Sequence, residues 1–214
     1  MRTITKMKQK KTSRITATER HNQILAVATE LFARQGFHGT TVRQVAERAK
    51  VNETILYRHF SSKQDLYWAV IEEECHLMAG HQSVVDQLNV CGYAKATFRA
   101  LSLDLLNRYS ADTTLMRLLL FCGLEARESS ERFFETYTAG YYEALAKNIR
   151  QRIKSGEFRD VDPLLAARSF VGMVNHYLMV QKLFGGKRYQ RFDSQRVAET
   201  LTDIWLNGMR IKLA

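Results

Sequence analysis

Residues 41–60 read TVRQVAERAKVNETILYRHF, and this stretch decides the fold of the chain. Four small apolar residues in its first half share the i, i+3, i+4, i+7 spacing of a buried helix stripe: Val42, Val45, Ala46 and Ala49. Three larger residues supply an inward face in its second half: Val51, Leu56 and Phe60. The stretch therefore predicts two short helices joined by a tight turn.

Capping residues fix where these helices begin. Thr41 followed by Gln44 is a capping-box pattern, and Asn52 is a favourable N-cap for the second helix. Two helices this short need a third to bury their apolar faces. The segment before Gly36 supplies it, with apolar residues at helical spacing: Ile24, Val27, Ala28, Leu31 and Phe32. Three helices with a tight turn before the last predict a helix-turn-helix unit, whose final helix enters the DNA major groove.

The distribution of charge supports the same interpretation. The chain has a formal net charge of +10, and residues 1–70 hold 13 Lys and Arg against 5 Asp and Glu, a net of +8. Residues 71–214 hold 19 and 17, a net of +2. Positive charge concentrated beside the motif releases counterions from DNA and supplies sequence-independent affinity. A basic segment that only keeps the protein soluble is the alternative.

Three longer stretches of the sequence match the pattern of a known family. ILAVATELFARQGFHGTTVRQVAERAKV covers residues 24–51, LYRHF covers 56–60 and SSKQDL covers 61–66. From about Arg20 to Val70 the chain resembles the TetR-type transcriptional repressors. SGEFRDVDPLLAARSFVGMV and a helix ending LNGMRI are more loosely similar to the C-terminal domains of that family.

The resemblance implies roles for eight residues in DNA binding. Thr41 and Arg43 correspond to positions that contact phosphates or the edge of the site. Asn52, Glu53 and Thr54 open the recognition helix and are expected to face bases. Three more match positions that grip the DNA backbone: Tyr57, which can also pack against a base methyl, His59 and Lys63.

Two positions depart from the family pattern. Members usually have Gly where Lys50 lies, because the preceding helix ends there in a left-handed conformation. A lysine in this conformation destabilises the fold by on the order of 1 kcal/mol. Binding of a DNA phosphate by its side chain is the functional alternative. Thr54 replaces the Gly, Ala or Pro of many members, so the operator sequence is not transferable from a relative.

Composition favours an all-α fold. The 214 residues include one proline, Pro163, placed as an N1 residue after the N-cap Asp162, and no strand-like alternation. We expect a basic arm over 1–18, a helix-turn-helix domain over 19–65 and a larger helical effector-binding and dimerisation domain over 66–214. A linking helix is expected from Ser62 through Cys75. Further helices are expected at these ranges: 84–109, 113–128, 131–155, 163–184 and 194–212.

Other function classes are disfavoured. The longest apolar run spans 118–124, far below the roughly 20 residues of a membrane helix. The basic N-terminus lacks the apolar region of a secretory signal, and three cysteines without a CxxC pair suit a cytoplasmic protein. The arm over 1–18 has six basic residues and no acid, and it is either a DNA-contacting arm or a solvated tail.

Catalytic and metal signatures are weak. The chain contains no HExxH, Walker or GxSxG motif, so we expect no enzymatic activity and no cofactor. Glu72, Cys75, His76 and His81 are close in sequence, but the two histidines lie on different sides of a helix and a fourth ligand is not evident. We expect no metal site.

The last two helices are expected to hold a second copy of the chain. Six apolar residues were assigned by spacing and by the resemblance to a four-helix dimer interface: Phe170, Val174, Leu178, Val197, Leu201 and Trp205. Packing of both helices into the subunit's own core is the alternative.

An aromatic helix face suggests a site for a small molecule. Phe133, Tyr137 and Tyr141, with His176 from a later helix, are candidates for an effector pocket, and core packing is the alternative. We therefore expect a homodimer that binds a palindromic operator in double-stranded DNA and is released by a small hydrophobic or aromatic effector. A ligand-independent DNA-organising or protein-binding factor on the same fold is the second hypothesis.

Overall fold

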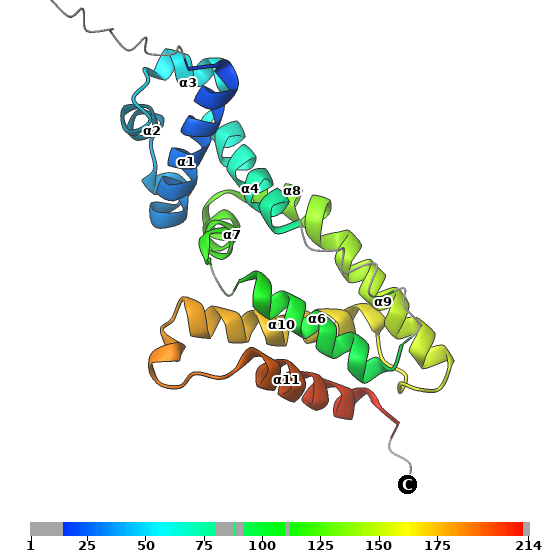
Figure 1. The fold of residues 1–214 in the computed structure, drawn as a ribbon. Helices are drawn as coiled ribbons and strands as arrows, with labels where there is room; N and C mark the ends of the chain where they lie inside the picture. The colour runs from blue at the N-terminus through cyan, green and yellow to red at the C-terminus, as the bar shows by residue number, and fades with distance from the viewer. Residues whose placement is uncertain (1–14, 80–87, 89–91, 110–111, 212–214) are drawn as a thin grey trace, which may run out of the picture.

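The computed structural model describes residues 15–79, 88, 92–109 and 112–211 (Figure 1). Most of the basic arm, His81, Cys91 and part of the helix expected over 84–109 lie outside these residues. The described chain is helical, which confirms the all-α fold, and only one isolated bridge, between Phe158 and Arg210, has β character. None of the described helices is long and apolar enough to span a bilayer.

Four helices form the N-terminal unit: α1 (Ala17–Gly39), α2 (Val42–Arg48), α3 (Glu53–His59) and α4 (Lys63–Ala79). The predicted caps are confirmed. The Thr41 hydroxyl accepts from the backbone N–H of Gln44, whose side chain accepts from the Thr41 N–H. The Ser62 hydroxyl caps α4 by accepting from the N–H of Asp65 at 2.9 Å.

Gly36 breaks α1 near its end. Its φ of 77° and ψ of −179° form a conformation that residues with a Cβ rarely adopt, whereas the sequence predicts that the helix ends at this glycine. Helical structure resumes immediately and runs to Gly39, so the expected stop is a kink within one helix.

The C-terminal part contains longer helices. They are α6 (Ala94–Arg108), α7 (Thr114–Glu125), α8 (Arg127–Phe133), the π-helical turn η1 (Phe134–Thr138), α9 (Ala139–Lys154), α10 (Pro163–Lys182), the 3-10 turn η2 (Gly186–Arg188) and α11 (Ser194–Met209). The helix expected over 131–155 thus begins earlier, at Arg127, and contains a wide π-helical turn. In Figure 1, α4 extends from the N-terminal unit toward α8, while α6, α10 and α11 lie together at the other end.

Two main apolar cores hold these layers. Phe32 and Tyr67 lie in the first core, which joins α1–α4 to α7 through Leu118. The second core joins α6, α9, α10 and α11 around Phe98, whose ring centroid lies 4.4 Å from that of Trp205. Full burial of one such side chain stabilises by about 1.5–3 kcal/mol, so Leu118 and Cys122 bind α7 firmly to the N-terminal unit.

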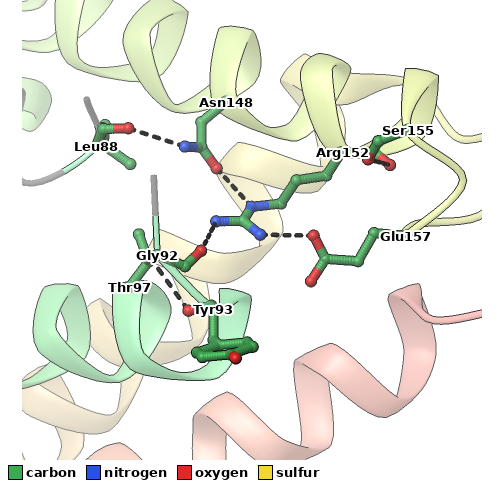
Figure 2. Close-up of polar contacts among 8 residues, drawn as sticks. All are labelled: Leu88, Gly92, Tyr93, Thr97, Asn148, Arg152, Ser155 and Glu157. Atoms are coloured by element: carbon green, nitrogen blue, oxygen red, sulfur yellow. Dashed lines mark hydrogen bonds and ion pairs between the residues drawn. The ribbon is translucent and has the colours of Figure 1, made fainter. Parts of the chain in front are cut away.

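A polar network ties the chain before α6 to α9 (Figure 2). The Asn148 amide donates to the Leu88 carbonyl at 2.9 Å and accepts from Arg152 Nε at 3.0 Å. The same guanidinium donates to the Gly92 carbonyl at 2.9 Å and pairs with Glu157 at 2.6 Å. Because Asn148 is buried and fully engaged, this end of α9 is fixed against the start of α6.

Candidate functional site

The second helix of the motif, α3, presents a polar outer face. Its first residues Glu53 and Thr54 are exposed, and the Tyr57 side chain is 47% exposed although Tyr is a large hydrophobic residue. Leu56, on the inner side, is completely buried. The Asn52 side chain accepts from the N–H of Ile55 at 2.8 Å, so it caps the helix and its amide oxygen is already hydrogen-bonded.

The turn between α2 and α3 has the conformation expected from the family pattern. Lys50 has a φ of 54°, and it is the one non-glycine residue with positive φ in the described chain. The turn is held by the N–H of Val51, which donates to the Ala46 carbonyl at 2.9 Å, and by Gln23 of α1, which donates to the Ala49 carbonyl at 3.0 Å. The strain at Lys50 is therefore held in place by α1.

Residues expected to grip the DNA backbone differ in how free they are. Arg43 is exposed but pairs with Glu47 at 2.8 Å, and Thr41 is exposed at its N-cap position. His59 is half-buried, with its ring centroid 5.8 Å from that of His21. Lys63 Nζ lies 4.3 Å from the centroid of the Phe37 ring, and burial lowers the pKa of this amine.

Sequence reasoning missed the polar contacts that α7 makes with the N-terminal unit. Arg117 donates through Nε to the Ala33 carbonyl at 2.6 Å, just before the kink. The Glu125 carboxylate accepts from the backbone N–H of His38 at 2.9 Å, just after it. The Tyr67 hydroxyl of α4 donates to the Leu118 carbonyl at 2.8 Å.

These contacts make α7 the partner of the broken helix. At a kink, carbonyl groups before the break lose their usual N–H donors, and N–H groups after the break lose their usual carbonyl acceptors. Arg117 serves the first set and Glu125 the second, with the charge signs that a helix dipole favours. No local pattern reveals such contacts, because they join residues more than 80 positions apart.

The aromatic residues assigned to an effector pocket are only partly brought together. Phe133 and Tyr137 have ring centroids 5.6 Å apart, and Tyr137 lies beside Trp68 of α4. Tyr141 follows one turn later on α9, where burial raises the pKa of its hydroxyl. His176 is exposed on α10, so the structure does not place it with these aromatic side chains.

The residues assigned to a dimer interface already lie in the subunit's own core. Five are buried within the single chain: Phe170, Val174, Leu178, Val197 and Trp205. Leu201 is partly buried and packs against the same interior. The assignment of these residues is corrected accordingly: spacing identified the apolar faces, but the chain covers them itself. Leu165 and Ile204, 68% and 58% exposed, mark the faces of α10 and α11 that remain open.

Comparison with known proteins agrees with this geometry over both halves. Residues 24–70 match the family described as "Bacterial regulatory proteins, tetR family", and residues 102–208 match the "AefR-like transcriptional repressor, C-terminal domain" family. The chain is 42% identical over 60 residues to the HTH-type transcriptional activator FasR of Mycolicibacterium smegmatis, which covers 28% of this chain and 27% of FasR. It spans only about a quarter of the length of such curated relatives.

Two solved structures share the fold over most of the chain. The structure of AibR in complex with isovaleryl coenzyme A and operator DNA has a TM-score of 0.66 and 24% identity, covering 87% of this chain and 97% of AibR. FadR from Bacillus subtilis, in complex with stearoyl-CoA, has a TM-score of 0.63 and 19% identity, covering 88% and 98%.

Proposed function

This chain belongs to the TetR family of bacterial regulatory proteins, and from that premise we propose that it is a dimeric repressor released from its operator by a small, largely apolar effector. Membership of the family makes it a DNA-binding transcriptional regulator. The observation that carries the proposal is the exposed, capped helix α3, set by a strained turn against α1.

The outer face of α3 suggests how bases are read. Glu53 is acceptor-only when ionised and therefore suits the N4 amino group of cytosine, whereas the Thr54 hydroxyl suits a donor or an acceptor. The cap bond of Asn52 reduces its freedom to contact a base. We assign base readout to Glu53 and Thr54, with Tyr57 against the backbone or a base methyl.

Backbone affinity comes from several cations around this face. Lys63 lies at the start of α4, and Lys50 is exposed at the turn. Arg43 must exchange its ion pair with Glu47 for a phosphate. Arg43 is paired with Glu47 in the free protein and would be paired with a phosphate in the complex. We therefore expect it to contribute less to DNA affinity than Lys63.

The test is selection of operator sequences from random DNA, followed by binding titrations with alanine variants at several salt concentrations. Tyr57→Ala and Lys63→Ala should weaken binding to all sequences alike, and Lys63→Ala should reduce the salt slope by about one charge. Glu53→Ala and Thr54→Ala should change preference by about 1–3 kcal/mol at one or two base pairs. Lys147→Ala, an exposed charge on α9, is the matched control and should change neither.

A uniform loss in all four variants would show that the recognition face is assigned wrongly. Failure to select any DNA sequence would contradict the whole proposal. An operator affinity that no effector alters would favour the ligand-independent alternative.

Release by an effector requires a connection between the two parts of the chain. We propose that α4 acts as a lever, since it begins at Lys63 and ends in the C-terminal domain, and that α7 shares this role through Arg117 and Glu125. Two recognition helices fit DNA only about 34–36 Å apart. An effector that favours another spacing lowers operator affinity, and operator lowers effector affinity by the same factor. Uncharged apolar compounds should be titrated with and without operator, and the acyl-coenzyme A ligands named with AibR and FadR serve as the charged comparison.

Dimerisation is proposed through the open faces of α10 and α11. Leu165→Arg or Ile204→Glu places a charge where a partner would desolvate it, and either change should yield monomers that remain folded. Lys147→Glu on α9 is the control. Light scattering that shows intact dimers in both variants would move the interface elsewhere.

A further inference from the structure

Three largely buried polar side chains lie near one another, two on α6 and one at the start of α9. Asp104 and Arg108, one turn apart on α6, form an ion pair of 2.7 Å, and their side chains are only 12% and 22% exposed. Tyr141 of α9 is close enough for both charges to act on its hydroxyl. That hydroxyl is buried and has no hydrogen-bond partner among the residues that the structure describes.

An unpartnered buried hydroxyl requires an explanation. Burial first, and then the nearby Asp104 carboxylate, raise the pKa of Tyr141, so its hydroxyl remains neutral and available as a donor. Leaving such a group without a partner disfavours the folded state, and native proteins rarely do so without a functional reason. Phenylalanine would pack equally well here at no such cost. The hydroxyl therefore calls for a partner that the described part of the chain does not supply.

The backbone before Tyr141 gives a second, independent indication. The chain passes through the π-helical turn Phe134–Thr138 immediately before α9. Such wide turns are uncommon in helices and occur frequently at functional sites, because they redirect the side chains that follow. Tyr137 lies within this turn and Tyr141 directly after it.

The far end of α9 is held rigidly. Asn148 and Arg152 fix it to the carbonyls of Leu88 and Gly92 near the start of α6 (Figure 2). Asp104 and Arg108 lie toward the other end of α6, so the Tyr141 end of α9 is positioned by an anchored helix. A site built on anchored helices keeps its polar groups in place before a ligand arrives.

We propose that Tyr141, Arg108 and Asp104 form the polar end of the effector site and recognise the carbonyl oxygen of an uncharged, otherwise apolar ligand. This inference rests on the proposed function and names the class of effector. A carbonyl oxygen accepts two hydrogen bonds, one from the Tyr141 hydroxyl and one from the nitrogens of Arg108 that do not bind Asp104.

Charge balance excludes the ionised alternatives. Asp104 already neutralises Arg108 in a largely buried setting. A ligand carboxylate would place two anions on one guanidinium and leave one of them poorly compensated, and a ligand ammonium would lie beside the Arg108 cation. An uncharged acceptor satisfies the free donors without disturbing the pair.

The experiment compares three probes of similar size by calorimetry: 2-octanone, octanoate and octylamine. The native protein should bind 2-octanone most tightly, and Tyr141→Phe should weaken that binding about tenfold. The same variant should leave the thermal stability of the free protein equal or higher, because it removes an unpartnered group. Tyr142→Phe removes the neighbouring hydroxyl and is the matched control, with no expected change in affinity.

A second variant tests the role of charge. Asp104→Asn frees the guanidinium of Arg108, so preference should change from 2-octanone to octanoate. If Asp104→Asn does not fold, Tyr141→Phe decides alone. Absence of 2-octanone binding, tightest binding of octanoate by the native protein, or unchanged affinity in Tyr141→Phe would each overturn the inference.

Operator binding, measured on the same preparations without probe, separates the two hypotheses. Native protein that binds no operator would contradict the proposed function. Operator binding that persists without any preference for the ketone contradicts only the inference about the effector.

Discussion

Replacing Gly36 by alanine should separate the N-terminal unit from α7 and destabilise the protein. An added Cβ would lie 2.7 Å from Phe121 Cδ1 and 2.7 Å from a Glu125 carboxylate oxygen. Both distances are far below van der Waals contact, so the side chains of Phe121 and Glu125 must shift, which disturbs the contact between α7 and the kink. The backbone would also have to keep a φ of 77° with a side chain attached, or leave it and break the kink.

The two effects have separate magnitudes. A residue with a Cβ in this region of φ and ψ costs about 1–3 kcal/mol. Forcing extra volume into a packed contact costs about 1–3 kcal/mol more. The sum, about 2–6 kcal/mol, is a large fraction of the roughly 5–15 kcal/mol that stabilises a typical domain. With m of about 2 kcal/mol per molar urea, the unfolding midpoint should fall by about 1–3 M.

Urea titrations at one fixed protein concentration provide the assay, because dimerisation would otherwise shift the apparent stability. Gly123→Ala on α7 is the control: nothing lies within 4 Å of an added Cβ there. In a helix interior this change should stabilise by about 0.5–1 kcal/mol. If Gly36→Ala stays within about 0.5 kcal/mol of the native protein, the inferred fit between the kink and α7 is refuted.

Three further changes test other features. Lys50→Gly should stabilise by about 0.5–1 kcal/mol in urea titrations by relieving the positive φ, whereas Lys50→Ala should not; equal gains would point to charge instead. Tyr67→Phe should cost about 0.5–1.5 kcal/mol through the lost bond to the Leu118 carbonyl, and an unchanged melting temperature would contradict this. Burial raises the pKa of Glu74, so its protonated form favours folding below about pH 4.5 and that contribution is lost as the pH rises through the folded pKa. Glu74→Gln should therefore raise the melting temperature at pH 7 more than at pH 4, and the opposite order would reverse the sign of the shift.

The parts of the fold that could be predicted depend on local chemistry. The caps at Thr41 and Asn52 follow from a few neighbouring residues, whereas the left-handed conformation of Lys50 follows from the family resemblance, and the structure confirms all three. The periodicity of apolar residues also placed α10 and α11 within a few residues of their observed ends. Such features depend on backbone geometry, which sequence spacing specifies directly.

Partnerships between faces could not be predicted in the same way. The helix faces that contain Val174 on α10 and Trp205 on α11 are apolar whether they pack against the same chain or another. In the structure their own chain covers them. The spacing of the apolar residues carries no information on that choice. The exposure of Leu165 and Ile204 does indicate which faces are open to a partner, but that exposure depends on which helices pack around these residues. The wide turn before Tyr141 likewise has no sequence signature.

The order of elements explains how a small molecule could act on a DNA-binding helix through a short route. Tyr141 follows the wide turn, which continues directly from α8, and α8 follows α7 after Ala126. Glu125, at the end of α7, holds the N–H of His38 beyond the kink in α1. Tyr141 lies only 16 positions after Glu125. A ligand that moves the start of α9 therefore acts on the helix that begins at Arg127, which the non-helical residue Ala126 joins to the end of α7 that is fastened to α1. Since α1 also holds the turn before α3 through Gln23, a displacement at Tyr141 can change the orientation of the recognition helix without passing through α4. Glu125→Gln should then weaken the coupling between effector and operator while leaving effector affinity in the absence of DNA unchanged.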